Sequence, residues 1–341
     1  MSPRRPPETD GPRRLVPLSQ ILGQEPVVEM LRQALATGKL HHALLFVGPE
    51  GVGKRTTASA LAARLLCGSP VGADACGRCA ACAQVAVGSH ADFRCEGFFF
   101  DERKKDRSES MVIEQMRGLQ SFLGGRALAG GRKVAILEEA HALTEEAQNA
   151  LLKTLEEPPR GSLIVLVCHN ASKLQLTVRS RCQRVAFAPL APAVVETILR
   201  RGLELPDEDA RFLAIHSEGS LAFAADPALF REAHERIVKL LAGVDARSYV
   251  AAAAAAKELL STAKGVPLDL KVLLGLLRRR MRACAGLEGS AQLTRPGKTG
   301  TLVDALHAVE AAYGAVVDLG RNANRRLATE RMWLRIGESL D

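Results

Sequence analysis

Three short runs of consecutive apolar residues stand out in the first half of the chain, each bounded by turn residues or charges. Runs of this length without polar alternation are typical of strands that are buried on both faces. Helix-like stretches separate them, and this alternation predicts a parallel sheet covered by helices on both faces. The three runs are His42–Val47, Lys133–Leu137 and Leu163–Val167.

The segment before the third run has the pattern of one amphipathic helix. Thr144 is a suitable N-cap, two glutamates follow in the first turn, where the helix dipole favours carboxylates, and Pro158-Pro159 ends the helix. We expect its apolar face to pack on the sheet. That face carries Ala147, Leu151 and Leu155.

Strand-like runs disappear after about residue 189, and helical patterns replace them. Residues 190–247 have the pattern of several short helices, whereas residues 248–341 are rich in alanine and leucine at helical spacing. We therefore expect an α/β domain over 17–189, two helical domains after it, and a disordered tail over 1–16. Helix breaks are expected at Gly202, Pro206, Gly219 and Pro227.

Length and composition fit an ordinary soluble protein of about two or three domains. The chain has 341 residues, of which 47% are hydrophobic and 25% charged. It contains no apolar run of the length that a membrane helix needs, about 18 residues, and no signal-peptide pattern, so we expect a cytoplasmic protein. The net charge of +8 is compatible with binding to nucleic-acid phosphates, but a solvated, arginine-rich surface explains it equally well.

A phosphate-binding loop is predicted directly after the first apolar run. Its glycines allow backbone N–H groups to wrap a phosphate at a helix N-terminus, and its lysine reaches the β- and γ-oxygens. The next position normally carries a Ser or Thr that ligates Mg²⁺, but here it is Arg55, with Thr56 one residue late. The candidate nucleotide-binding residues are Gly48, Gly51, Gly53, Lys54, Arg55 and Thr56.

The second nucleotide element, the Walker B strand, departs from its usual form as well. The run Lys133–Leu137 is followed by Glu138, where an aspartate normally holds Mg²⁺ through water, and by Glu139, at the position of the water-orienting carboxylate. Glu138 is one methylene longer than an aspartate. Two departures in one site predict a retained fold with weakened chemistry, and the residues leave open whether ATP and Mg²⁺ bind.

Four cysteines follow the phosphate loop with the spacing C-x8-C-x2-C-x2-C. Four thiolates this close, with Gly77 allowing a tight turn, form the ligand set of a closed structural Zn²⁺ site, which would fold a small insertion over about 67–82. The alternative is four unpaired cysteines in a surface excursion. The candidate ligands are Cys67, Cys76, Cys79 and Cys82, and the remaining cysteines are scattered, as small buried residues would be.

Together these features resemble the clamp-loader branch of the AAA+ ATPases. The cysteine spacing is similar to the zinc module of bacterial loader subunits. Further likeness lies in Ile21–Gln24, Ala140–Thr144, Asn149–Pro159 and Ser180-Arg181-Cys182. The last of these matches the SRC motif, in which the arginine reaches the ATP of a neighbouring subunit, so the resemblance implies that Arg181 is a trans-acting arginine finger.

Within this branch, the chain resembles the delta-prime class of bacterial DNA polymerase III subunits more than the gamma/tau motor class. Motor subunits usually carry a phosphate-loop Thr and a Walker B aspartate, which Arg55 and Glu138 replace here. The sensor-1 region, Cys168-His169-Asn170, also differs from the usual polar pair. Asn322–Glu330 looks like the delta-prime signature, and no tau-like extension is expected after Asp341.

The resemblance implies a RecA-like AAA+ domain with a zinc-binding insertion, an all-α lid over 190–247 and an all-α collar over 248–341 through which subunits oligomerise. It implies a stator of the DNA polymerase III clamp loader, which helps open the sliding clamp and load it onto primed DNA. The implied partners are the gamma/tau and delta subunits, the sliding clamp and, through the assembled loader, primer–template DNA. Autonomous ATPase activity is doubtful, and polymerase activity has no residues to carry it.

Two other functions stay open at this point: a gamma/tau-like motor ATPase and a zinc-stabilised DNA-binding module. Arg181 also has an ordinary interpretation, as a surface arginine in a solvated ion pair. The basic patches at 103–107 and 278–282 are interpreted as solvated faces, with contact to DNA phosphates or an acidic partner as the alternative.

Overall fold

The structure, a computed structural model of the whole chain, divides into two compact units. The first unit comprises the residues up to Val194 together with Gly219–Ala222, and the second comprises Val195–Glu218 and the residues from Phe223 on. No helix in the described part is long and apolar enough to cross a membrane. The residues described are 15–97, 100–101, 106–107, 111–128, 131–243, 248–261, 266–286, 301–320 and 324–340, so nearly all of the predicted tail lies outside them.

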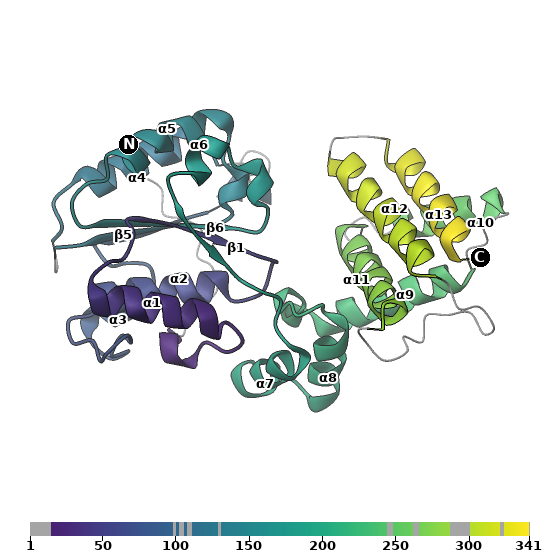
Figure 1. Cartoon of the computed structure of the whole chain (residues 1–341), viewed down its shortest axis with the longest axis horizontal. Coiled ribbons are helices and arrows are strands. Elements are labelled where there is room, and N and C mark those ends of the chain that lie inside the picture. The colour runs from purple at the N-terminus through teal and green to yellow at the C-terminus, as the bar shows by residue number, and fades with distance from the viewer. Residues whose placement is uncertain are drawn as a thin grey trace. The chain divides into compact units, whose positions relative to one another are not determined.

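A five-stranded parallel sheet forms the centre of the first unit (Figure 1). In spatial order its strands are β2 (Phe93–Glu96), β5 (Lys133–Leu137), β6 (Ser162–Cys168), β1 (Ala43–Val47) and β7 (Gln183–Ala186). The three predicted runs form the three inner strands, so the predicted parallel sheet is confirmed. A separate antiparallel pair consists of β3 (Phe100–Asp101) and β4 (Asp106–Arg107).

Helices cover both faces of this sheet, as predicted (Figure 1). Successive residues of a strand point to opposite faces, so Phe46 belongs to the core beneath α1 and α2, and Leu45 to the core beneath α4 and α5. Each large apolar side chain buried there stabilises the fold by about 1.5–3 kcal/mol. One face carries α1 (Glu25–Thr37), α2 (Lys54–Leu66) and α3 (Ala80–Ala86); the other carries α4 (Ile113–Gly124), α5 (Glu145–Glu156) and α6 (Leu176–Arg179).

The helix expected before the third run is α5, and its boundaries have the expected causes. The Thr144 hydroxyl accepts a hydrogen bond from the Ala147 backbone N–H at 3.3 Å. The helix ends at Glu156, just before the proline pair. Its predicted apolar face is fully buried against the sheet, with Ala147, Leu151 and Leu155.

The described residues of the second unit are helical, without strands. The predicted breaks are confirmed at Gly202, Pro206 and Pro227, which lie at or next to helix ends. Trp333 and Phe230 are among its fully buried side chains. The helices are α7 (Pro192–Gly202, which begins in the first unit), α8 (Asp207–His216), α9 (Pro227–Gly243), α10 (Tyr249–Ser261), α11 (Val266–Cys284), α12 (Leu302–Gly320) and α13 (Arg325–Leu340). The division into a lid and a collar near residue 247 stays a prediction.

Four short 3-10 helices complete the described secondary structure. They are Leu18–Gln20, Ala140–Ala142, Ala171–Lys173 and Ala222–Ala225. Two of them, Ala140–Ala142 and Ala171–Lys173, follow the carboxyl ends of the neighbouring strands β5 and β6 and border the site described next.

Candidate nucleotide and metal sites

The glycine-rich loop lies between the carboxyl end of β1 and the first turn of α2, which is the predicted strand–loop–helix placement. Gly51 and Gly53 have the positive φ values of 72° and 94° that favour glycine. A Cβ at Gly48 would lie 2.4 Å from the Phe187 carbonyl oxygen, and one at Gly51 2.4 Å from the Ala222 backbone nitrogen. Close backbone approach therefore requires glycine at both positions.

Lys54 begins α2 and folds back onto its own loop. Its Nζ donates a hydrogen bond to the Gly48 carbonyl at 2.7 Å and another to the Pro49 carbonyl. Burial lowers the pKa of the ammonium group, while the nearby Glu139 carboxylate acts in the opposite direction. The lysine that would reach a phosphate thus already has acceptors within the loop.

Arg55 forms an ion pair with Glu138 across the candidate Mg²⁺ position. Its Nε lies 2.5 Å from Glu138 Oε1, and the Cys95 thiol donates to the same oxygen at 3.1 Å. Thr56, the hydroxyl residue one position late, is exposed, and the next hydroxyl, that of Thr57, donates to the Gly53 carbonyl at 2.9 Å. The two sequence departures are therefore physically paired: the cation that replaces the Mg²⁺ ligand sits on the carboxylate that would serve the metal.

Glu139 lies beside two imidazoles that reach it from different loops. Its Oε2 lies 3.3 Å from His141 Nε2 and 3.5 Å from His169 Nδ1, and the two rings have centroids 3.7 Å apart. Burial, followed by the charges of His169, Lys173 and Lys54, lowers the pKa of His141 to about 4, with Glu50 acting in the opposite direction. The three side chains could hold a metal ion. Sequence reasoning did not bring them together.

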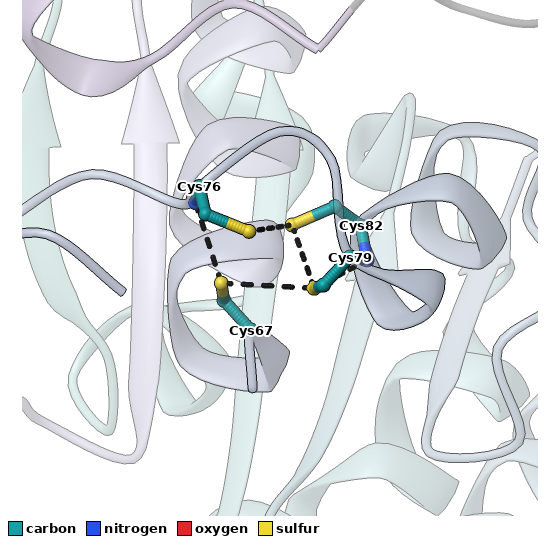
Figure 2. Close-up of side chains that lie close together, drawn as sticks. All are labelled: Cys67, Cys76, Cys79 and Cys82. Carbon is teal, nitrogen blue, oxygen red and sulfur yellow. Dashed lines mark hydrogen bonds between the residues drawn. The ribbon is translucent and has the colours of Figure 1, made fainter. Parts of the chain in front are cut away.

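The four predicted cysteines converge at the end of α2 and the start of α3 (Figure 2). Their sulfur atoms lie within 4.8 Å of one another, with separations of 3.9 Å between Cys67 and Cys79 and 3.5 Å between Cys79 and Cys82. Four sulfurs at about 2.3 Å from one zinc ion would be about 3.8 Å apart. All four cysteines are unbridged thiols, and Gly77 between them has a positive φ of 71°.

The electrostatics of the cluster differ from one thiol to the next. Hydrogen bonds from the backbone N–H groups of Cys82 and Gly68 lower the pKa of Cys79 to about 6. Burial raises the pKa of Cys82 to about 12. Backbone N–H groups directed at thiolates stabilise their negative charge, so the local fold provides part of what a four-thiolate metal site needs.

Arg181 follows α6 and is paired within its own unit. Its Nη2 lies 2.5 Å from Glu156 Oε1, at the end of α5, and its Nη1 donates to the Thr177 carbonyl at 2.9 Å. About a third of the side chain, 35%, stays exposed. The guanidinium is thus held by one carboxylate and one backbone carbonyl, and it remains partly accessible to solvent.

Gln24 is the buried end of the segment Ile21–Gln24. Its amide nitrogen donates to the Ala188 carbonyl at 2.7 Å and to the Val52 carbonyl at 3.2 Å. The segment is therefore tied to the phosphate loop and to the residues that follow β7.

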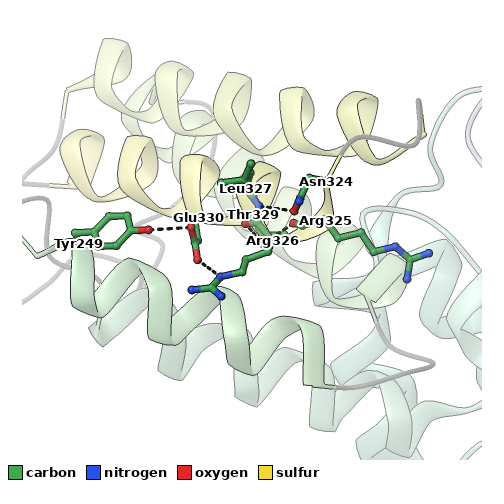
Figure 3. Close-up of polar contacts among 7 residues, drawn as sticks. All are labelled: Tyr249, Asn324, Arg325, Arg326, Leu327, Thr329 and Glu330. Atoms are coloured by element: carbon green, nitrogen blue, oxygen red, sulfur yellow. Dashed lines mark hydrogen bonds and ion pairs between the residues drawn. The ribbon is translucent and has the colours of Figure 1, made fainter.

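The described part of the signature segment braces the helices of the second unit (Figure 3). Arg326 Nε lies 2.7 Å from Glu330 Oε1, and the Tyr249 hydroxyl donates to Glu330 Oε2 at 3.0 Å, which links α10 to α13. Asn324 Oδ1 accepts from the Leu327 backbone N–H at the start of α13. Asn322 and Ala323 lie outside the described residues.

Most of the first basic patch lies outside the described residues, whereas the second lies within them. Residues 102–105, the main part of the first patch, lie outside the described residues. In the second patch, Arg282 pairs with Glu218 through two contacts of 2.6 and 3.0 Å, and Arg279 Nη1 lies 2.9 Å from His216 Nδ1. Two of the arginines at 278–282 therefore have partners inside their own unit.

The parallel sheet and the phosphate loop after its first strand define the class: a nucleotide-binding α/β fold of the phosphate-loop type. Residues 23–191 match the family whose model is described as DNA polymerase III, delta subunit. The chain therefore belongs to the family of DNA polymerase III clamp-loader subunits and is delta-prime-like.

Curated relatives agree with this assignment. The chain is 42% identical over 173 residues to the DNA polymerase III subunit delta' of Pseudomonas aeruginosa, covering 50% of each chain. It is 33% identical over 222 residues to subunit delta' of Escherichia coli (64% of each chain), and 35% identical over 164 residues to subunit tau of the same organism (48% of this chain and 24% of tau). The chain thus matches about half of the first of these relatives.

Among solved structures, a DNA polymerase III gamma subunit-related protein of Thermotoga maritima is 17% identical, with a TM-score of 0.44 over 92% of this chain and 99% of that one. RuvB from the same organism, a Holliday junction branch migration motor, is 15% identical, with a TM-score of 0.42 over 93% of this chain and 88% of that one.

Proposed function

We propose that the chain is the delta-prime subunit of a DNA polymerase III clamp loader and acts there mainly as a stator. It would help open the sliding clamp and load it onto primed DNA in the cytoplasm, without hydrolysing ATP in its own site. The observation that carries the proposal is the ion pair between Arg55 and Glu138. Because the Arg55 guanidinium neutralises the Glu138 carboxylate, this carboxylate is not available to hold Mg²⁺ between the β- and γ-phosphates, and Arg55 itself offers no metal ligand.

The remaining groups of the loop support the same interpretation. Lys54 Nζ is hydrogen-bonded to carbonyls of its own loop, and the partly exposed Glu139 carboxylate lies against two histidines. Hydrolysis needs a lysine on the phosphates and a carboxylate on the attacking water at the same time. Both would have to give up existing contacts before a nucleotide could react here.

Arg181 is the group that we assign to catalysis in trans. It is partly exposed, and a single carboxylate, Glu156, holds the outer end of its guanidinium. A γ-phosphate offers more negative charge than one carboxylate and matches the planar fork bidentately. We therefore expect Arg181 to leave Glu156 and reach the ATP of an adjacent gamma/tau subunit when the loader assembles.

The cysteine cluster supports a structural zinc ion. Four protein sulfurs leave no open coordination position, so the metal would fold the insertion over about 67–82 and take no part in chemistry. The helical segments 190–247 and 248–341 would serve as the lid and the oligomerisation collar, and the proposed partners are gamma/tau, delta, the clamp and primer–template DNA.

The test is reconstitution of the loader with wild-type motor subunits and an Arg181→Ala chain. Removing a sole arginine finger costs about 10³–10⁵ in turnover, but a loader has several sites, so we expect a smaller loss, confined to one site. Clamp- and DNA-stimulated ATPase and clamp loading should fall, while assembly and zinc content stay unchanged. Arg181→Lys should restore little, because an ammonium lacks the planar fork.

The matched control is Arg179→Ala, an exposed arginine in the last turn of α6. This control should leave both rates unchanged. Equal rates for wild type and Arg181→Ala would reduce Arg181 to an ordinary surface arginine and overturn the mechanism.

The alternative function is a gamma/tau-like motor, which the intact glycines and Lys54 of the phosphate loop favour. Steady-state ATPase of the isolated chain separates the two functions. The stator proposal expects negligible turnover, and robust turnover would support the motor.

A further inference from the structure

Glu139, His141 and His169 meet at one edge of the sheet because β5 and β6 are neighbouring parallel strands. Leu137, the last residue of β5, is in register with Leu166 near the end of β6. Glu139 and His141 follow β5, and His169 follows β6 directly. The carboxyl ends of adjacent parallel strands are where open α/β sheets bind their ligands.

The spacing of their ligand atoms fits a tetrahedral ion. Zinc binds nitrogen and oxygen ligands at about 2.0–2.2 Å, so two such ligands at the tetrahedral angle lie about 3.3–3.5 Å apart. Glu139 Oε2 lies 3.3 Å from His141 Nε2 and 3.5 Å from His169 Nδ1. One ligand atom from each of the three side chains lies within 4.8 Å of the other two.

The surroundings of His141 give a second, independent observation. Only 9% of this side chain is exposed, and its Nδ1 is buried without a hydrogen-bond partner in the described structure. A hydrogen bond at Nδ1 therefore does not account for burying this ring against a second imidazole, whose centroid is 3.7 Å away.

Some of the charged groups near this site would repel a bound cation, and others would attract it. Lys54 and Lys173 oppose it, whereas Glu50 and the adjacent Glu139 carboxylate favour it. Glu139 and His169 are each 39% exposed, so solvent can reach a metal ion held by them. Two histidines and one glutamate are a ligand set that zinc uses in sites with one open position.

We propose that Glu139, His141 and His169 form a second Zn²⁺ site, separate from the cysteine cluster, with its fourth position open to water. A metal ion held there would occupy the Glu139 carboxylate and keep it from orienting an attacking water. The site stands apart from the proposed stator function, because it holds whether or not Arg181 acts on a neighbouring ATP.

The experiment uses the full chain after its tightly bound zinc has been quantified by elemental analysis. Isothermal titration with Zn²⁺ should then reveal one additional equivalent. Loss of a group that merely orients a ligand typically weakens metal affinity 10- to 100-fold, so losing a ligand itself should weaken it by at least about 10-fold. His169→Ala and, separately, Glu139→Gln should show this loss; both side chains are partly exposed, so folding should survive, as circular dichroism would verify.

Two controls separate this site from other metal binding. His307→Gln removes an exposed histidine of the second unit and should leave the additional equivalent intact. Cys79→Ser should lower the tightly bound zinc while the titrated equivalent persists. Absence of a further equivalent in the wild type, or equal affinities in wild type, His169→Ala and Glu139→Gln, overturns the proposal and leaves the arginine-finger test unaffected.

Discussion

Replacing Arg55 by threonine tests the central electrostatic feature of the candidate nucleotide site. The substitution restores a Mg²⁺-ligating hydroxyl and removes the guanidinium from Glu138. Nucleotide binding by the wild type should depend little on Mg²⁺. In the variant, Glu138 becomes available to the hydrated metal, and a contact of this charge-assisted kind contributes about 1.5–3 kcal/mol, or about 10- to 100-fold in affinity.

The same substitution should cost little stability. Arg55 is 44% exposed and Glu138 17%, so the pair is close to a surface ion pair, and its loss should lower the free energy of unfolding by about 1 kcal/mol or less. Neither a large loss of stability nor a change in zinc content is expected. A drop in melting temperature of more than several degrees would show that the pair is structural.

The assay is a fluorescent-nucleotide titration of the isolated chain with Mg²⁺ and with EDTA. Thr56→Ala is the matched control, because this neighbouring hydroxyl is exposed and should be neutral. The contrary result is that Arg55→Thr binds nucleotide with the same affinity as the wild type, both with Mg²⁺ and with EDTA. In that case the ion pair does not replace the metal in this site. The reasoning from Arg55 to a non-hydrolysing site would then fail.

Three further predictions concern zinc, packing and pH. Cys79→Ser should lower bound zinc by one equivalent in elemental analysis, with the far-ultraviolet circular dichroism nearly unchanged, because the site folds only a local insertion. Leu151→Ala, in the fully buried face of α5, should lower the free energy of unfolding of the first unit by about 2–5 kcal/mol in urea, whereas Leu128→Ala at 79% exposure should change it by no more than about 0.5 kcal/mol. Burial lowers the pKa of His216 to about 3 in the folded chain, whereas the ordinary value is 6.5. Below pH 6.5 the unfolded chain therefore binds more protons than the folded chain, so the free energy of unfolding should fall as the pH drops from 7 to 4. His216→Gln should flatten this pH dependence of the melting temperature.

Sequence patterns predicted the inner strands but missed the outer ones, for a physical reason. The inner strands are buried on both faces and therefore form unbroken apolar runs. In β7, Val185 is the one buried residue, and its three neighbours are exposed, so the segment shows neither an apolar run nor alternation. In β2, Phe93 is buried and the other three residues are intermediate. Edge strands obtain their structure from a neighbour's hydrogen bonds, which local sequence does not report.

The candidate site was predictable to the extent that its ligands are close in sequence. Cys76, Cys79 and Cys82 lie within one turn and one helix start, so spacing alone predicted that they meet. The pairing of Arg55 with Glu138, and of Glu139 with His169, depends on which strands lie side by side. The residue types were visible as departures from the nucleotide-site pattern, but their contacts required the strand order.

Covering the sheet on both faces has a consequence for how strand register is specified. In a sheet with one wet face, a slip of one residue would expose apolar side chains, so polarity alone corrects it. In β1 every residue is buried, and both faces are apolar. Side-chain volume must therefore distinguish the correct register from a slipped one: Phe46 belongs to one core, while Ala43 belongs to the other. Deleting one residue of β1 would send the side chains on one side of the deletion to a face shaped for different volumes, while every position remained hydrophobic.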